Sequence, residues 1–301
     1  MMENTTNFCD LHTHSTASDG KDMPDVLIDR AVSVGLGAIA LCDHNTLRGV
    51  PDFLKAAEGK PITAVAGIEI SANYCAAEPS SRREHELHIL ALFVPAEAYG
   101  VLTDMTDRAN EWKRESNRAL VSALRREGFS IDYEALVAKY EEEGGSAFNR
   151  SHVAQELIDL GYYPKDTEIK PIIKTLLSEE RGLYVPPQRL DALRVIEVIR
   201  ECRALPVVAH PFLNMTRDEL RVFLPEAKAH GLVGMEAYYT TYDRETTECA
   251  EAFAAEFGLL TSGGSDYHGS AKPHTALGTG YGDLRIPMAV FETLKATAEA
   301  L

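Results

Sequence analysis

Short apolar runs alternate with helical segments along this chain, and nearly every run leads into a histidine or a carboxylate. The first run, residues 8–9, precedes His12-Thr13-His14, whose two imidazoles project to the same side of an extended strand. Later runs end in Asp43-His44, Glu69, His210, Glu236 and Asp266-Tyr267-His268, and one run begins near His88. Strands that alternate with helices form a parallel α/β sheet or barrel with its active site at the strand carboxyl ends. We therefore expect these side chains to converge on one face.

The strand candidates are residues 36–42, 62–68, 87–94, 205–209, 232–235 and 259–261. Helical periodicity is found in residues 24–35, 50–58, 191–203, 217–230 and 245–257. Residues 71–86 are polar and lack helical periodicity, so the run at 87–94 is expected to return antiparallel to 62–68 as a long-looped hairpin. This pairing places His88 at the start of its strand, beside Glu69 at the end of the partner strand.

Between residues 101 and 190, helical segments replace the alternation of apolar runs and helices. Glycines at 128, 144–145 and 161 separate four helical segments, residues 104–126, 133–142, 151–160 and 171–178. We interpret this stretch as an inserted helical domain that binds substrate or acts as a lid. Residues 1–100 and 191–301 would then form one metal-binding domain.

Composition narrows the possible partners. The formal net charge of −16 argues against binding duplex DNA through a basic surface, although bound cations and local arginines still allow a phosphorylated substrate. The five cysteines are odd in number and scattered, as free thiols in a reducing compartment are. Residues 1–7 lack the apolar core of a signal peptide, and no run approaches a membrane span. We expect a cytoplasmic protein without a membrane partner.

The imidazoles and carboxylates suggest a metal cluster. Each residue alone has a plainer explanation: His88 or His210 can be an ordinary strand-end histidine, Asp43 a helix N-cap, and Glu236 a hydrogen-bonded structural carboxylate. Together they form a nitrogen and oxygen ligand set without thiolate, which suits Mn²⁺, Fe²⁺ or Zn²⁺. The set is too large for one ion, so we expect two or three, bridged by a glutamate.

These motifs resemble the polymerase and histidinol phosphatase (PHP) family of metal-dependent phosphoesterases. The resemblance rests on His12-x-His14 with Asp19, Asp43-His44, Gly67-Ile68-Glu69, His88-Ile89-Leu90, Ala209-His210-Pro211 and Ser265-Asp266-x-His268, in the family's order. It implies a distorted (β/α)7 TIM-like barrel with a trinuclear centre. The implied ligand sets are His12, His14, Glu69 and Asp266 for one metal, Glu69, His88 and His210 for a second, and Asp19, His44 and His268 for a third.

The insertion resembles that of the PHP branch acting on 3′,5′-nucleoside bisphosphates and 5′-phosphorylated RNA. Arg150-Ser151-His152 matches an Arg-Pro-His segment of that branch, with serine in place of proline, and Arg181 stands where lysine is usual. An arginine fork and an imidazole donor suit phosphate binding. Arg118 is a further candidate; its alternative is a solvated helix face, paired with Glu111 and Glu115.

The sequence thus predicts a metal-dependent phosphoesterase of nucleotides, acting by attack of a metal-bridging hydroxide. Glu69, Asp266 and His268 are the candidate catalytic residues, and one of the last two would move a proton. The expected substrate is a small phosphorylated molecule such as AMP or a 3′,5′-bisphosphate, or short single-stranded RNA. The alternatives are a histidinol-phosphate phosphatase and a non-catalytic nucleotide-binding or polymerase-associated module. His85 and His274 are expected on the surface.

Overall fold

The computed structural model describes residues 8–76, 84–142 and 148–301. Contacts divide the chain into two compact units. The first unit combines Met1–Thr106 with Leu190–Leu301, and the second is Asp107–Arg189.

The first unit is built on one sheet of mainly parallel strands. In sheet order the strands are β8 (Leu260–Gly264), β7 (Gly234–Tyr239), β6 (Leu205–Val208), β4 (Glu84–Leu92), β3 (Thr63–Cys75), β2 (Ala38–Leu41), β1 (Phe8–Thr13) and β9 (Ile286–Pro287). A short strand, β5 (Leu190–Asp191), pairs with β3. Strand β4 runs antiparallel to both β3 and β6, as the hairpin prediction required, while β1–β2–β3 and β6–β7–β8 are parallel sets.

The two ends of this sheet approach each other, which makes it a nearly closed barrel. Beyond β8, the backbone N–H of Asp266 donates to the His12 carbonyl at 2.9 Å. The His14 N–H donates to the Tyr267 carbonyl, also at 2.9 Å, and Thr13 bridges Tyr267 in parallel. The distorted α/β barrel predicted from the sequence is therefore confirmed, and its closure brings β1 and β8 side by side.

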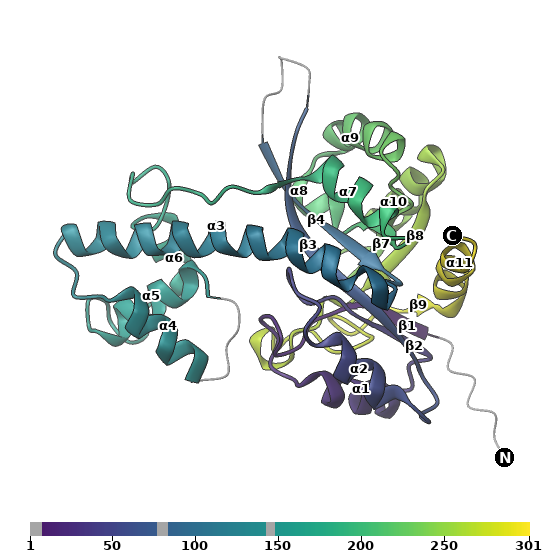
Figure 1. Cartoon of the computed structure of the whole chain (residues 1–301), viewed down its shortest axis with the longest axis horizontal. Helices are drawn as coiled ribbons and strands as arrows, with labels where there is room; N and C mark the ends of the chain where they lie inside the picture. The colour runs from purple at the N-terminus through teal and green to yellow at the C-terminus, as the bar shows by residue number, and fades with distance from the viewer. Residues whose placement is uncertain (1–7, 77–83, 143–147) are drawn as a thin grey trace. The chain divides into compact units, whose positions relative to one another are not determined.

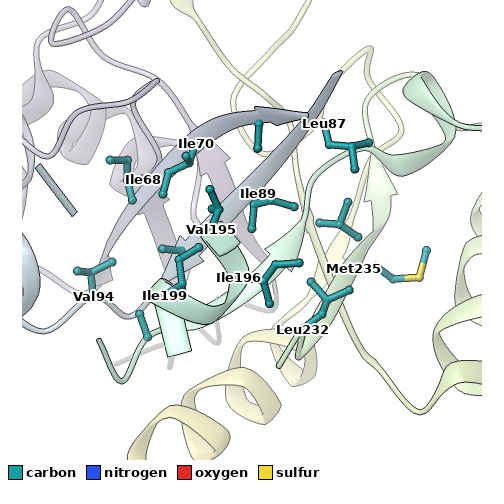
Figure 2. Packing of buried hydrophobic residues seen from close by; sticks show 14 of the residues in the cluster. Ile68, Ile70, Leu87, Ile89, Val94, Val195, Ile196, Ile199, Leu232 and Met235 are labelled. Atoms are coloured by element: carbon teal, nitrogen blue, oxygen red, sulfur yellow. The ribbon is translucent and has the colours of Figure 1, made fainter. Parts of the chain in front are cut away.

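Helices cover the outside of the sheet (Figure 1). They are α1 (Pro24–Ser33), α2 (Val50–Ala57), α7 (Ala192–Glu201), α9 (Arg217–Ala229) and α10 (Arg244–Phe257), with a short α8 (Pro211–Asn214). Helix α11 (Met288–Glu299) instead packs with residues of the inner face. Helix α7 presents Val195, Ile196 and Ile199 to β3 and β4, where they pack with Ile68 and Ile89 (Figure 2). This packing fixes the orientation of the two antiparallel strands.

Strand alternation sends neighbouring residues to opposite faces. Ile68 and Ile70 belong to the cluster under α7, so Glu69 between them faces the barrel interior. Its register partner on β4, Leu90, packs with Phe291 and Leu294 of α11 in a second buried cluster. Glu69 is therefore a buried carboxylate on the inner face, 1% exposed, with apolar residues such as Leu90 beside it.

Two details differ from the sequence predictions. Strand β3 continues to Cys75, so Glu69 lies inside the strand, and His88 likewise lies within β4 rather than at its start. Pairing continues through Cys75, and Ile70, Ala72 and Tyr74 alternate with polar residues and are buried along the extension of β3. His85 was expected on the surface, but it is buried, with Nδ1 3.3 Å from the Asn214 carbonyl and Nε2 3.4 Å from Glu219.

The second unit is helical. It contains most of α3 (Tyr99–Arg126), followed by α4 (Tyr133–Glu142), α5 (Arg150–Asp159) and α6 (Ile169–Lys174). Leu120, Leu124, Leu136, Val153 and Leu157 form its own apolar core. Asn149 caps α5 by accepting a hydrogen bond from the Ser151 N–H at 2.9 Å.

All five cysteines have free thiols in the structure. Cys9 and Cys42 are buried, whereas Cys75 is exposed. None of the helices in the described ranges combines the length and apolar character needed to cross a bilayer.

Candidate metal centre

Glu69 lies at the centre of a ring of imidazoles. Its Oε1 is 2.7 Å from His88 Nδ1 and 3.1 Å from His210 Nε2. Its Oε2 is 3.0 Å from His44 Nδ1, and 3.3 Å from the Nε2 atoms of both His12 and His14. Each carboxylate oxygen therefore faces a different group of histidines, which is the arrangement expected of a bridging ligand.

The loop after β2 brings His44 to Glu69. The Asn45 N–H donates to the Glu69 carbonyl at 2.8 Å, and His44 and Glu69 form an isolated parallel bridge. The side-chain oxygen of Asn45 then accepts the Ser71 N–H at 3.1 Å. The segment beyond β2 thus continues the pairing with β3, which fixes where the His44 ring points.

Glu236 orients the ring of His12. Its Oε1 lies 2.9 Å from His12 Nδ1, and its Oε2 accepts the backbone N–H of His210 at 2.7 Å. Because a buried carboxylate accepts hydrogen bonds, the proton of His12 is placed on Nδ1, and Nε2 presents its lone pair to the interior. Glu236 was expected to be such a hydrogen-bonded carboxylate.

Three groups of side chains have ligand atoms within 4.8 Å of one another, close enough to hold an ion. They are His14, Asp19, His44 and His268; His12, His14 and Asp266; and His44, Glu69 and His88. His210 belongs to none of the three, although it contacts Glu69. The structure therefore brings together all nine residues that the sequence singled out as ligands, from strands or loops far apart in the chain.

The buried atoms of this cluster fit bound cations. His12 Nε2, both ring nitrogens of His14, Glu69 Oε2 and His210 Nδ1 have no hydrogen-bond partner of acceptable geometry among the described residues. Buried polar atoms are nearly always satisfied, so such a concentration at one place calls for another partner. Imidazole nitrogens and carboxylate oxygens are donors that Mn²⁺, Fe²⁺ and Zn²⁺ accept.

The electrostatics favour the ligand forms of two central residues. Burial lowers the pKa of His14 well below its usual range, and the neighbouring His268 adds to the effect. Burial alone would raise the pKa of Glu69, but the imidazoles of His44, His88 and His12 outweigh it and hold that pKa well below its usual range. A neutral imidazole and an ionised carboxylate are the states that bind metals. Burial would lower the pKa of His12 and His44, but Glu69 raises both, so a metal would displace a proton from these two rings.

Backbone geometry is constrained at the same place. His210 and Asp266 adopt left-handed conformations, with φ of 32° and 54°. Such angles are strained for residues other than glycine, and they concentrate at functional sites. Gly264 lies so close to β1 that a Cβ built on it would stand 2.1 Å from the Cβ of His12. Only glycine allows this approach of β8 to β1.

The chain matches the model of the PHP domain over residues 10–179, which is more than half of its length. It is 30% identical over 263 residues to the 5′-3′ exoribonuclease Rnm of Escherichia coli, covering 86% of this chain and 84% of that protein. The chain belongs to the PHP family.

Other relatives agree with this PHP membership. The chain is 25% identical over 261 residues to the 3′,5′-nucleoside bisphosphate phosphatase of Chromobacterium violaceum, with 86% of each protein covered. A solved structure described as a metal-dependent phosphoesterase from Bifidobacterium adolescentis matches with a TM-score of 0.73 at 24% identity, covering 96% of each chain. The structural likeness shows that the fold is that of the family.

The substrate candidates of this PHP chain lie in the helical unit. The Arg150 guanidinium stacks 4.0 Å from the centroid of the Tyr184 ring and donates to the Leu177 carbonyl at 3.1 Å. His152 Nδ1 accepts the Asn149 N–H at 3.0 Å in the capping box of α5. These contacts hold both side chains in fixed orientations.

The other two candidate arginines, Arg118 and Arg181, are exposed. Arg118 pairs with Glu134 at 3.1 Å and stacks 4.9 Å from the Tyr133 ring centroid, instead of pairing with Glu111 or Glu115. Arg181 lies 3.5 Å from Glu127. An exposed ion pair contributes little to stability, so either arginine can leave its partner for a phosphate.

From the sequence, Asp10 had no assigned role in the PHP barrel, and Asp43 was expected only as part of the Asp43-His44 motif or as a helix N-cap. Asp10 and Asp43 each hold a loop through a serine: Asp43 accepts the Ser15 N–H at 2.8 Å and its hydroxyl at 2.6 Å, and Asp10 does the same for Ser265. Burial raises the pKa of both carboxyl groups, which their donors only partly offset. Asp10 could have been predicted, because it stands two residues before His12 and so lies on the same face of the strand. No sequence pattern indicated Tyr239 or Lys272, which contact Asp266.

Proposed function

We propose that this phosphoesterase of the PHP family hydrolyses phosphate esters of nucleotides, including nucleoside bisphosphates and the 5′ end of short RNA. The observation that carries the proposal is the position of Glu69, which presents its two oxygens to five imidazoles at the end of the barrel. No purely structural explanation accounts for so many unpartnered nitrogens around one carboxylate.

The ligand atoms support two or three ions. As the family resemblance implies, His12, His14, Glu69 and Asp266 would hold one ion, Glu69, His88 and His210 a second, and Asp19, His44 and His268 a third, with Glu69 shared by the first two. When bound, divalent ions would neutralise phosphate charge and lower the pKa of a water molecule. Glu236 keeps the His12 ring oriented for this role, and Asp10 and Asp43 keep the neighbouring loops in place.

Asp266 and His268 are proposed to handle the proton. His268 Nδ1 lies 2.8 Å from the Asp266 carbonyl, which can only accept, so the ring proton is on Nδ1 and Nε2 faces Asp19 at 3.2 Å. Burial would raise the pKa of Asp266, but His14, His12 and Lys272 keep it well below its usual range. Asp266 is therefore ionised at neutral pH and does not serve as the proton donor.

We propose that the helical unit, predicted as residues 101–190, binds the substrate. Arg150, His152, Arg181 and Arg118 would contact its phosphate groups. An arginine already stacked on a tyrosine loses little further freedom when it binds, which favours Arg150 as the principal contact. The exoribonuclease and bisphosphate phosphatase names of two relatives support nucleotide phosphates as the substrate class.

A substrate panel tests the proposal. The protein, loaded separately with Mn²⁺, Fe²⁺ or Zn²⁺, is assayed with 3′,5′-nucleoside bisphosphates, AMP, short 5′-phosphorylated RNA and histidinol phosphate. We expect kcat/KM to be highest for one of the nucleotide substrates. Preference for histidinol phosphate would favour the alternative predicted from the sequence. Tight nucleotide binding without turnover under every metal would contradict a hydrolase.

A further inference from the structure

Asp266 uses its two carboxylate oxygens for different purposes. Oδ1 lies 3.2 Å from His14 Nε2 and 3.4 Å from His268 Nδ1, on the side of the imidazole cluster. Oδ2 accepts the Tyr239 hydroxyl at 2.8 Å and lies 2.6 Å from Lys272 Nζ. One oxygen therefore faces the ligand atoms, and the other is occupied by two donors from the protein.

Tyr239 is held firmly enough to act as a fixed donor. It is the last residue of β7, and its side chain is buried. Its ring centroid lies 5.2 Å from that of His210 and 5.4 Å from that of Tyr242. Tyr239 thus touches two proposed ligands, His210 through its ring and Asp266 through its hydroxyl, and the packing prevents the hydroxyl from turning away.

Lys272 approaches Asp266 from the loop after β8. It follows a single 3-10 turn, η3 (Gly269–Ala271), and its backbone N–H donates to the Gly269 carbonyl at 3.2 Å. The side chain is 44% exposed, so the ammonium is hydrated on one side and bound to Oδ2 on the other. Its loss would remove a charge-assisted hydrogen bond without leaving a cavity.

We propose that Tyr239 and Lys272 are positioning residues that occupy Oδ2 of Asp266 and so reserve Oδ1 for the metal centre. The inference rests on the proposed function, because it takes Asp266 as a ligand. Without the two donors, the carboxylate can rotate about its terminal bond and offer either oxygen, or both. Partners of this kind behind a ligand commonly change metal affinity by about 10- to 100-fold.

The test measures metal affinity directly. Tyr239→Phe, Lys272→Met and the double variant are compared with the wild type by calorimetric titration with Mn²⁺ and by elemental analysis after dialysis. We expect Mn²⁺ affinity to fall about 10-fold in each single variant and up to about 100-fold in the double variant. Lys272→Arg should restore most of the affinity, and excess Mn²⁺ should recover kcat in Lys272→Met.

Two matched controls separate positioning from general damage. Tyr238→Phe removes a hydroxyl that donates to Glu251, from the neighbouring residue of the same strand. Lys139→Met removes an ammonium that is also 44% exposed and pairs with Glu156 and Asp159. Both controls should bind Mn²⁺ like the wild type. Circular dichroism and thermal unfolding check that every variant is folded.

The outcomes distinguish this inference from the proposed function. Wild-type affinity in folded Lys272→Met and Tyr239→Phe, with affinity lost in Asp266→Asn, would overturn the positioning role and leave the metal centre intact. A wild-type protein that binds no Mn²⁺, Fe²⁺ or Zn²⁺ would overturn both. Equal losses in the controls and in the variants would also overturn the positioning role.

Discussion

Asp10 and Ser265 are 255 positions apart in sequence, yet they are joined by two short hydrogen bonds. The Ser265 N–H donates to Oδ1 at 2.8 Å, and its hydroxyl donates to Oδ2 at 2.6 Å. The Gly278 N–H adds a third bond to Oδ2 at 2.8 Å. This clamp ties β1 to the residue that follows β8, directly before the Asp266 that faces the proposed metal centre.

The first prediction concerns this clamp. In Asp10→Asn, one carboxylate oxygen becomes an amide NH2 group. That group cannot accept the hydrogen bond from the Ser265 or the Gly278 N–H, so one of these buried N–H groups loses its acceptor. We expect the free energy of unfolding to fall by about 2 kcal/mol and metal affinity to fall with it. Urea unfolding with fluorescence detection measures the first effect. Asp29→Asn, which changes an exposed carboxylate paired with Lys60, is the control and should be within about 0.5 kcal/mol of wild type.

Gly264 provides the second prediction. A methyl group there would collide with the backbone and Cβ of His12, neither of which can move without opening the barrel. Gly264→Ala is therefore expected to lose metal binding and to unfold at a lower urea concentration. Gly100→Ala is the control, since a Cβ at Gly100 has open space in α3; there alanine should be neutral or stabilise by up to about 1 kcal/mol. Unchanged metal binding in Gly264→Ala would contradict the close packing of β8 on β1.

The third prediction concerns thiol reactivity. Burial, with the nearby Asp10 carboxylate, raises the pKa of Cys9 to about 12. The native state therefore keeps this thiol protonated at pH 8. The free energy of unfolding should fall as pH rises from about 9 toward 12, because the thiol ionises more readily in the unfolded chain. Alkylation at pH 8 followed by peptide mass spectrometry should modify exposed Cys75 and spare Cys9. Equal alkylation rates of Cys9 and Cys75 in the native protein would refute the burial of β1. Equal rates are expected only in urea.

Several features of the molecule could be predicted from sequence because they depend on local pattern. The alternation of apolar runs and helices predicted a parallel sheet or barrel, the family resemblance selected the distorted barrel, and the residues that end the runs predicted the cluster around Glu69. The barrel interior is where such strand ends must meet, so each motif supported the others. The antiparallel return of β4 followed from the absence of a crossover helix.

Other features depend on contacts that no local pattern encodes. The bonds between Asp10 and Ser265 join β1 to the residue after β8, and these become neighbours only when the barrel closes. Tyr239 reaches Asp266 because the chain turns directly after β8, the neighbour of β7. The extension of β3 to Cys75 combines pairing with β4 and the burial of alternate residues Ile70, Ala72 and Tyr74. His85 is buried because α8 and α9 fold over the end of that hairpin, which makes its polar sequence context misleading.

The fourth prediction tests the helical unit. If Arg150 binds phosphate through its planar fork, Arg150→Lys should raise KM for a nucleotide substrate about 10- to 100-fold, which corresponds to about 1.5–3 kcal/mol. The value of kcat should change much less. Arg114→Lys, at an exposed arginine paired with Glu111, is the control. An unchanged KM in Arg150→Lys would remove this residue from the substrate site.

The most direct test of the metal centre is the metal content of Glu69→Gln compared with that of the wild type. This variant keeps the size of the side chain but replaces one bridging oxygen with an amide. We expect the wild type, purified without chelator, to hold two or three ions per chain, and the variant to lose at least one of them and more than about 100-fold in kcat/KM. Glu251→Gln changes the acceptor of the Tyr238 hydroxyl and is the control. It should keep its full metal content. Wild-type stoichiometry and turnover in Glu69→Gln would contradict a centre bridged by Glu69.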